Sequence, residues 1–175
     1  ILAECGAAKA IIAGLSLGGY MSLAFNVRYP ENVRALMLFD TGPGYKNATA
    51  REGWNETSEK RAVAFETKGF GAMGGSAEVR VSSHRSADGL ARAARGMLAQ
   101  FDARIIESLP NITVPTLVLV GANDQPFLGA SEYMAAKVPG AAKVMIPDAG
   151  HSANIDQPAA FNAAVTGFLA GLPSA

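Results

Sequence analysis

The fold is decided by one short stretch, Ala10-Ile11-Ile12-Ala13-Gly14-Leu15-Ser16-Leu17-Gly18-Gly19. Its first four residues are wholly apolar, which is typical of a strand buried on both faces of a parallel sheet. Leu17–Tyr29 fits a helix that ends at Pro30. Between strand and helix, Gly14–Gly18 matches the pattern G-x-S-x-G, whose small residues allow a sharp turn. The sequence therefore predicts a strand–turn–helix unit that raises the Ser16 hydroxyl above the sheet.

The same alternation of apolar runs and helices continues toward the C-terminus. Further strands are predicted at Val33–Phe39, Thr116–Val120 and Ala142–Ile146, and further helices at Ser131–Lys137 and Pro158–Ala170. Residues 1–8 are typical of the end of a helix that stops near Gly6. Strands that alternate with helices predict an α/β fold with a mostly parallel sheet.

The middle of the chain, residues 45–109, is more polar and rich in alanine. It shows no strong strand pattern, and helices are predicted at Ala48–Thr67 and Ala87–Phe101, with Ser86 as the N-cap of the second. Four residues are expected as the contacts of that helix: Leu90, Met97, Leu98 and Phe101. The chain is therefore expected to consist of a core, residues 1–44 and 110–175, and a helical insertion.

Composition restricts the function. Of 175 residues, 49% are hydrophobic, which supplies a sizeable core for one domain, and 15 Lys and Arg balance 15 Asp and Glu. This balance argues against a nucleic-acid or anionic-membrane partner. Cys5 is the one cysteine, so no intrachain disulfide or Cys-rich metal centre is possible. We expect a cytoplasmic protein without metal or cofactor. Residues 10–27 are uncharged, but polar residues interrupt them and they are short for a membrane span.

A serine hydroxyl needs a base to become a good nucleophile, and the chain has two histidines. His151 follows the last predicted strand, where the carboxyl end of a parallel sheet binds ligands. His84 lies in the helical insertion and is expected on the surface. The sequence therefore favours His151 as the base for Ser16.

The base in turn needs a carboxylate that orients it. Asp124 follows the strand Thr116–Val120, and Asp40 follows the strand Val33–Phe39, so either side chain could reach the site. The order Ser, Asp, His along the chain favours Asp124. Asp148 and Asp156 are expected to stabilise loops or cap helices.

These stretches together resemble the α/β-hydrolase superfamily, in particular its esterase and enol-lactonase-like branch. The resemblance rests on residues 10–19, Phe39–Gly44, Leu117–Pro126 and Pro147–His151. It implies a partial α/β-hydrolase fold, with strands five to eight of an eight-stranded sheet and a helical cap at Tyr45–Leu109.

The resemblance also implies a serine hydrolase that cleaves small carboxylic esters. Ser16 would attack, His151 would transfer the proton, Asp124 would orient His151, and the Leu17 backbone N–H would stabilise the oxyanion. Four apolar side chains are candidates for an acyl pocket, with ordinary core packing as the alternative: Trp54, Phe65, Met73 and Phe127. A truncated, weakly active or non-catalytic hydrolase that serves as a binding or assembly module is the alternative function.

Complete members of this superfamily carry four more strands and two helices ahead of the matching segment. The strand at Ala10–Ala13 would therefore expose an edge, which invites pairing with another chain. We expect a homodimer that buries this side. The loop that supplies the second oxyanion donor in the family also precedes the matching segment, so that donor is expected from another chain or from a local group.

Overall fold

The computed structural model describes residues 1–75 and 77–174, and the chain divides into two compact units, Ile1–Pro43 with Glu107–Ala175, and Gly44–Ile106. The elements of the first unit are β1 Ala10–Leu15, α1 Leu17–Arg28, a 3-10 turn Pro30–Asn32, β2 Val33–Phe39, a 3-10 turn Leu109–Asn111, β3 Thr116–Gly121, α6 Gln125–Lys137, β4 Ala142–Ile146, α7 Ala153–Asp156 and α8 Pro158–Ala170. The second unit holds α2 Ala48–Lys68, a 3-10 turn Gly69–Ala72, α3 Ala77–Arg80 and α4 Ala87–Met97, and α5 Arg104–Ser108 crosses the boundary.

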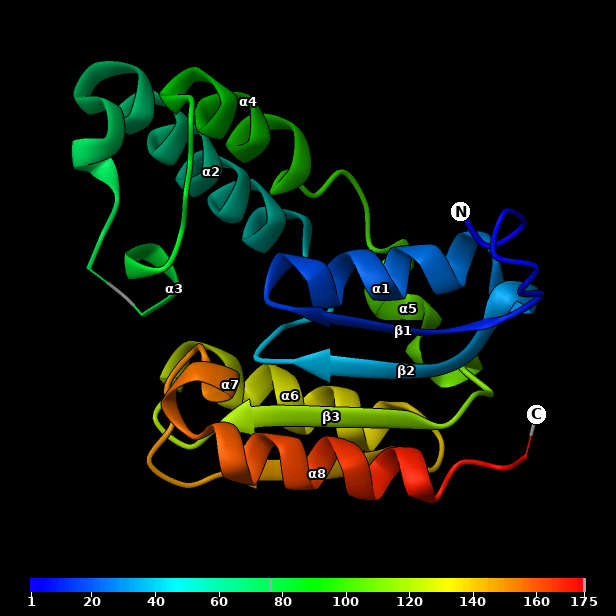
Figure 1. Cartoon of the computed structure of the whole chain (residues 1–175). Helices are drawn as coiled ribbons and strands as arrows, with labels where there is room; N and C mark the ends of the chain where they lie inside the picture. The colour runs from blue at the N-terminus through cyan, green and yellow to red at the C-terminus, as the bar shows by residue number, and fades with distance from the viewer. Residues whose placement is uncertain (76, 175) are drawn as a thin grey trace. The chain divides into compact units, whose positions relative to one another are not determined.

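The sheet of the first unit has four parallel strands in the order β1-β2-β3-β4 (Figure 1). Leu15 pairs with Phe39, Phe39 with Leu119, and Gly121 with Ile146. The carboxyl ends of all four strands therefore meet at one edge. The predicted α/β class with a mostly parallel sheet is confirmed.

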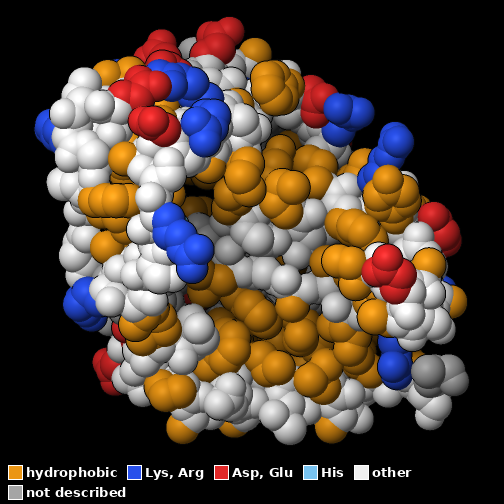
Figure 2. Space-filling view, turned by 45° about the horizontal axis from the view of Figure 1, so that its top comes forward, with side chains coloured by type: hydrophobic (Ala, Val, Ile, Leu, Met, Phe, Trp, Pro, Cys, Tyr) orange, Lys and Arg blue, Asp and Glu red, His pale blue; other side chains and the backbone are white. Residues whose placement is uncertain are grey.

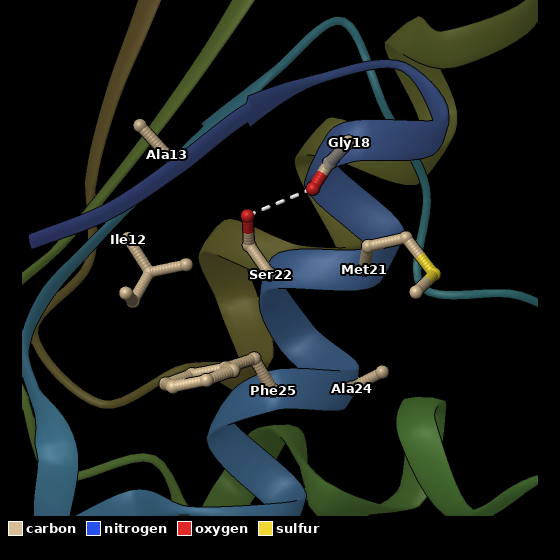
Figure 3. A pocket seen from close by; sticks show the side chains of 7 residues that line it. All are labelled: Ile12, Ala13, Gly18, Met21, Ser22, Ala24 and Phe25. Carbon is tan, nitrogen blue, oxygen red and sulfur yellow. Dashed lines mark hydrogen bonds between the residues drawn. The ribbon is translucent and has the colours of Figure 1, made fainter. Parts of the chain in front are cut away.

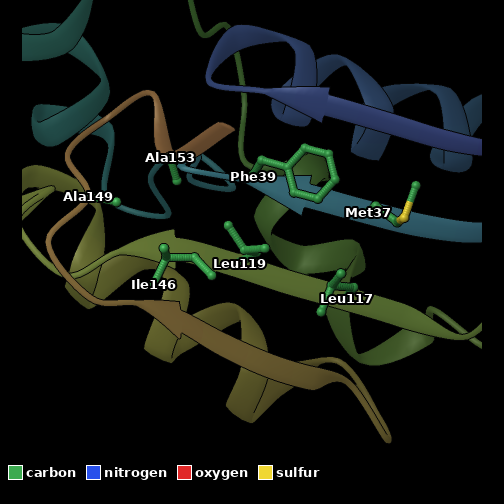
Figure 4. Packing of buried hydrophobic residues seen from close by; sticks show 7 residues of the cluster. All are labelled: Met37, Phe39, Leu117, Leu119, Ile146, Ala149 and Ala153. Carbon is green, nitrogen blue, oxygen red and sulfur yellow. The ribbon is translucent and has the colours of Figure 1, made fainter. Parts of the chain in front are cut away.

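The two central strands are buried on both faces, as their apolar runs predict. Figure 4 shows the cluster on one face, where Met37 and Phe39 of β2 meet Leu117 and Leu119 of β3. Helix α8 covers this face, and its Phe161 ring meets the Phe39 ring edge-on at 4.9 Å. Right-handed crossovers place α1 and α6 on the opposite face.

Strand β1 forms one edge of the sheet, and its residues are mostly only half-buried. An open groove of about 470 Å³ lies between β1 and α1 (Figure 3). Its lining is almost entirely apolar, and its Ser22 hydroxyl donates to the Gly18 carbonyl at 2.8 Å. The open edge agrees with the sequence-based expectation, while the homodimer through this edge stays a prediction.

The helical unit is built on the pairing of α2 with α4. Ala62, Ala91 and Ala94 are buried between the helices, with Phe65 and Leu98 packed against them. Ser86 caps α4 as predicted, because its side chain accepts from the Gly89 N–H at 3.0 Å. Outside this small core, a contact between the Tyr45 and Trp54 rings and several polar contacts add to the unit. The Arg95 guanidinium on α4 bonds Glu59 and Glu66 on α2.

The prediction that the second helix continues to Phe101 is wrong. Helix α4 ends at Met97, and the Phe101 side chain is 84% exposed. Met97 is also half exposed, whereas Leu98 packs against the alanine core as expected. The helix stops because the following backbone bonds α2 instead, with the Gln100 N–H donating to Asn55 Oδ1 at 2.7 Å. The Trp54 indole N–H of α2 likewise donates to the Leu98 carbonyl at 2.6 Å.

Two other helix ends depend on local signals. The helix predicted at Ser131 begins at Gln125 instead, where Pro126 occupies the first turn, a position that suits proline. Residues 2–6 form turns rather than a helix. This segment nevertheless has the hydrogen bonding typical of a helix C-terminus. Gly6 adopts a φ of 64°, and the Ala7 N–H donates to the Leu2 carbonyl.

The face in Figure 2 shows no dominant charge. On the face in Figure 2, Lys and Arg side chains are mixed with Asp and Glu, and hydrophobic side chains gather between them. Within the described residues, no helix combines the length and apolar character needed to cross a membrane.

Candidate active site

Ser16 sits at the junction between β1 and α1, in the strained turn that the sequence predicts. Its φ is 54°, a region that few residues other than glycine adopt. Three backbone groups hold the residue there: its N–H donates to the Phe39 carbonyl at 2.9 Å, and its carbonyl accepts from the N–H groups of Gly19 and Tyr20. Such strain marks a site whose surroundings fix one conformation.

Two glycines of the turn are required by close contacts. A Cβ at Gly14 would overlap the Gly18 backbone, and a Cβ at Gly19 would overlap the Thr41 side chain. The prediction that small residues allow strand and helix to pack around this turn is confirmed for both positions. Gly18, by contrast, faces open space.

His151 lies in the loop between β4 and α7, and both of its ring nitrogens have partners. Its Nε2 is 2.9 Å from Ser16 Oγ, and its Nδ1 is 2.9 Å from Asp124 Oδ2. With the proton on Nδ1, the ring donates to Asp124 and accepts from Ser16. The Phe127 ring stacks on the imidazole at 5.0 Å and 23°. The structure thus brings together the three residues that the sequence singles out.

Asp124 occupies the N-cap position of α6, a place where an aspartate usually caps its own helix. Its side chain makes no capping bond and turns to His151 instead. The side chain is only 4% exposed. Burial excludes competing water, so the carboxylate holds the imidazole in one orientation.

The loops that carry Asp124 and His151 are bonded to each other. The Asn123 N–H donates to the Ala149 carbonyl at 2.8 Å, and the Ala122 N–H donates to the Ile146 carbonyl at 2.9 Å. The Asp156 carboxylate accepts from the Gly150 N–H at 2.8 Å, the loop-stabilising role expected for it. Hydrogen bonds to the backbone therefore fix the loop that carries Asp124 and the loop that carries His151 relative to each other.

Asp40, the other candidate acid, is fully buried but does not bond His151. Its Oδ1 accepts from the Gly121 N–H at 2.7 Å. Burial raises the pKa of its carboxyl to about 6, because the charged form loses its hydration. Of the two candidate acids, the structure pairs Asp124 with the imidazole.

Comparison with known proteins gives the family. A profile of the alpha/beta hydrolase family matches residues 1–164. This chain belongs to the α/β hydrolase family. A Bacillus subtilis (strain 168) protein assigned as a 2-succinyl-6-hydroxy-2,4-cyclohexadiene-1-carboxylate synthase is 26% identical over 94% of this chain and 67% of its own. The 3-oxoadipate enol-lactonase 2 of Acinetobacter baylyi is 27% identical over 90% of this chain and 62% of its own.

Solved structures agree with this assignment. A thermophilic esterase from Thermogutta terrifontis aligns with a TM-score of 0.82 and 27% identity, over 99% of this chain and 69% of that chain. The enol-lactonase from Burkholderia xenovorans LB400 aligns with a TM-score of 0.76 and 25% identity, over 97% and 68%. This α/β hydrolase chain therefore spans about two thirds of the length of the relatives it matches.

Other site residues predicted from the sequence fall in both units of this α/β hydrolase. Leu17 is the first residue of α1, so its N–H has no acceptor within the helix and points out of the N-terminal end. Phe127 lies beside His151. Trp54, Phe65 and Met73 belong to the helical unit and stay predictions for an acyl pocket. His84, also in that unit, is exposed, as expected.

Thr41 is a site residue that the sequence analysis missed. Its hydroxyl donates to the Ser16 carbonyl at 2.5 Å, and its side chain packs against Gly19. No pattern distinguishes a threonine that bonds a distant backbone carbonyl from any other threonine after a strand. Within the described part of the chain, no group of three or more His, Cys, Asp or Glu side chains is placed to hold a metal ion.

Proposed function

We propose that this chain carries the catalytic residues of a serine hydrolase that cleaves small carboxylic esters. One observation carries the proposal: Ser16 Oγ, the two ring nitrogens of His151 and Asp124 Oδ2 form a continuous hydrogen-bonded chain with two links of 2.9 Å. This is the geometry in which a serine is activated by a base that a carboxylate orients.

In the proposed reaction, Ser16 Oγ attacks the ester carbonyl carbon while its proton passes to His151 Nε2. The Asp124 carboxylate stabilises the imidazolium that forms. The Leu17 N–H stabilises the negative carbonyl oxygen, aided by its position at the N-terminus of α1. His151 then gives the proton to the leaving alcohol oxygen as the bond from this oxygen to the carbonyl carbon breaks. The acyl group stays bound to Ser16 Oγ. Water activated by His151 hydrolyses this acyl-enzyme and restores Ser16.

The proposed substrates are small esters with an apolar acyl group. Support comes from Phe127, whose ring lies against His151 and offers an apolar wall next to the reacting atoms. An esterase and two enol-lactonases stand among the relatives, and a lactone is a cyclic ester.

A non-catalytic binding or assembly module is the second candidate. The observation that favours it is the open apolar groove beside β1, which contains none of the Ser16, His151 and Asp124 side chains. The two functions differ in what they require, because only catalysis depends on the hydrogen-bonded chain.

The proposal is tested by ester hydrolysis with p-nitrophenyl acetate and butyrate. Ser16→Ala, His151→Ala and Asp124→Asn should each lower kcat at least about a hundredfold, and the double variants should lose little more, because the residues act as a unit. His84→Ala is the matched control and should retain full activity. Each variant is checked for folding by circular dichroism.

Two results would contradict the proposal. Folded wild-type protein without ester turnover would favour the binding module. Near wild-type activity in Asp124→Asn, with an inactive Asp40→Asn, would show that Asp40 is the acid that orients the base.

A further inference from the structure

Asp40 lies directly after β2, where its backbone and side chain both bond β3. Its N–H donates to the Leu119 carbonyl at 2.9 Å, and its Oδ1 accepts from the Gly121 N–H at 2.7 Å. The Gly121 carbonyl in turn accepts from the Asp124 N–H at 3.0 Å. The Asp40 carboxyl therefore holds Gly121, the residue from which the Asp124 turn begins.

The two neighbours of Asp40 contact the nucleophile. The Phe39 carbonyl accepts from the Ser16 N–H, and the Thr41 hydroxyl donates to the Ser16 carbonyl. Three consecutive residues at the end of β2 thus fix the Ser16 turn on one side and the Asp124 turn on the other. A displacement of Asp40 would be passed to both.

The hydrogen bond to Gly121 does not by itself require a charged carboxyl at position 40. A neutral amide oxygen could accept the same N–H. Asp40 is fully buried; besides the Gly121 N–H, the Ala153 backbone N–H at the start of α7 acts on its carboxyl and favours ionisation, although Oδ2 lies outside direct hydrogen-bond geometry. Burial without a close partner for Oδ2 still disfavours the charged form. The charged groups that act on Asp40 are Asp124, which disfavours its ionisation, and His151, which favours it. Asp156, on the segment that carries His151, is bonded to the Gly150 N–H.

We propose that Asp40 is a positioning residue of this site: its carboxylate anchors the Asp124 turn and places a second negative charge near His151, which favours the imidazolium formed during attack. The inference rests on the proposed ester hydrolysis. Asn at position 40 keeps an acceptor for Gly121 and tolerates the positive φ of 44°, but its NH2 replaces an oxygen on which the Ala153 N–H acts, so the pH dependence of the loss, not its size, reports the charge.

The charge is active only when Asp40 is ionised. Burial raises the pKa of this carboxyl to about 6, so it is mostly neutral at pH 5 and charged at pH 8. The ratio of wild-type to Asp40→Asn kcat should therefore rise from near one at pH 5 to on the order of ten at pH 8, with KM unchanged. Asp148→Asn is the matched control, because Asp148 also follows a strand at positive φ but is exposed.

The coupling is measured without any turnover by 13C NMR of the aspartate carboxyl carbons, with the Asp40 signal identified by its loss in Asp40→Asn. The pKa of Asp40 should fall in Asp124→Asn, which removes the like charge, and rise in His151→Gln, which removes the imidazole whose positive form favours ionised Asp40. Opposite shifts in the two variants would support the proposal. An Asp40 carboxyl that titrates near 4 and responds to neither variant would overturn it, as would a kcat ratio that stays constant with pH. If the wild type shows no turnover, the proposed function fails, whereas the NMR titration still decides the coupling.

Discussion

The two units of this chain are stabilised in different ways. The α/β unit buries large aliphatic side chains completely, among them Leu36, Leu38 and Leu119. The helical unit buries three alanines between α2 and α4, and adds exposed ion pairs around Arg95. The Ser16, Asp124 and His151 geometry is held by backbone bonds within the α/β unit. A change in that unit should therefore disturb stability and geometry together, while the helical unit should tolerate change.

Truncation of the two cores should show the largest contrast. Leu38→Ala removes a fully buried side chain from β2 and should cost about 2–5 kcal/mol of unfolding free energy. Ala91→Gly in α4 removes one buried methyl group and increases the conformational entropy of the unfolded chain, so it should lower the free energy of unfolding by about 1–2 kcal/mol. Urea unfolding measures both. Equal losses would show that the cores contribute alike.

Glycine-to-alanine substitutions should change the free energy of unfolding in opposite directions in the two units. Gly14→Ala places a Cβ on the Gly18 backbone and should destabilise by about 1–3 kcal/mol, with loss of ester hydrolysis. Gly53→Ala lies inside α2, where a Cβ meets open space, and should stabilise by about 0.5–1 kcal/mol. A stable and active Gly14→Ala variant would contradict the close contact at the Ser16 turn.

The smallest effect is expected at the ion pairs of the helical unit. Hydrogen bonds from Arg95 lower the pKa of Glu59 and Glu66 below the ordinary carboxyl range. Their contribution is present at neutral pH and is lost as the pH falls through those lowered pKa values. Arg95→Gln should lower Tm slightly at pH 7, and high salt should remove the difference. Exposed Arg92→Gln on the same helix is the control, and an equal Tm loss in that variant would contradict a specific role for Arg95.

Much of the α/β unit follows from the sequence because its signals are local. The strands Val33–Phe39 and Ala142–Ile146 and the helix Pro158–Ala170 have the predicted bounds. Since parallel strands end at one edge, Ser16, Asp124 and His151 were expected together, and the structure places them within hydrogen-bond distance.

The rest depends on contacts between residues far apart in the sequence. Asp40 and Asp124 both follow buried strands, and only the turn after Gly121 decides which carboxyl reaches His151. The end of α4 depends on the bond between Asn55 and Gln100, 45 residues apart. No local sequence pattern predicts which carboxyl reaches His151 or where α4 ends.

Activation of Ser16 is the central claim, and covalent labelling tests it most directly. A fluorophosphonate reacts with a serine that a neighbouring base has activated, so intact-mass measurement and peptide mapping of the folded protein should show one adduct, on Ser16. The adduct should be absent in Ser16→Ala, much slower to form in His151→Ala, and unchanged in His84→Ala. Folded wild-type protein that stays unlabelled, or that is labelled on another serine, would contradict the account.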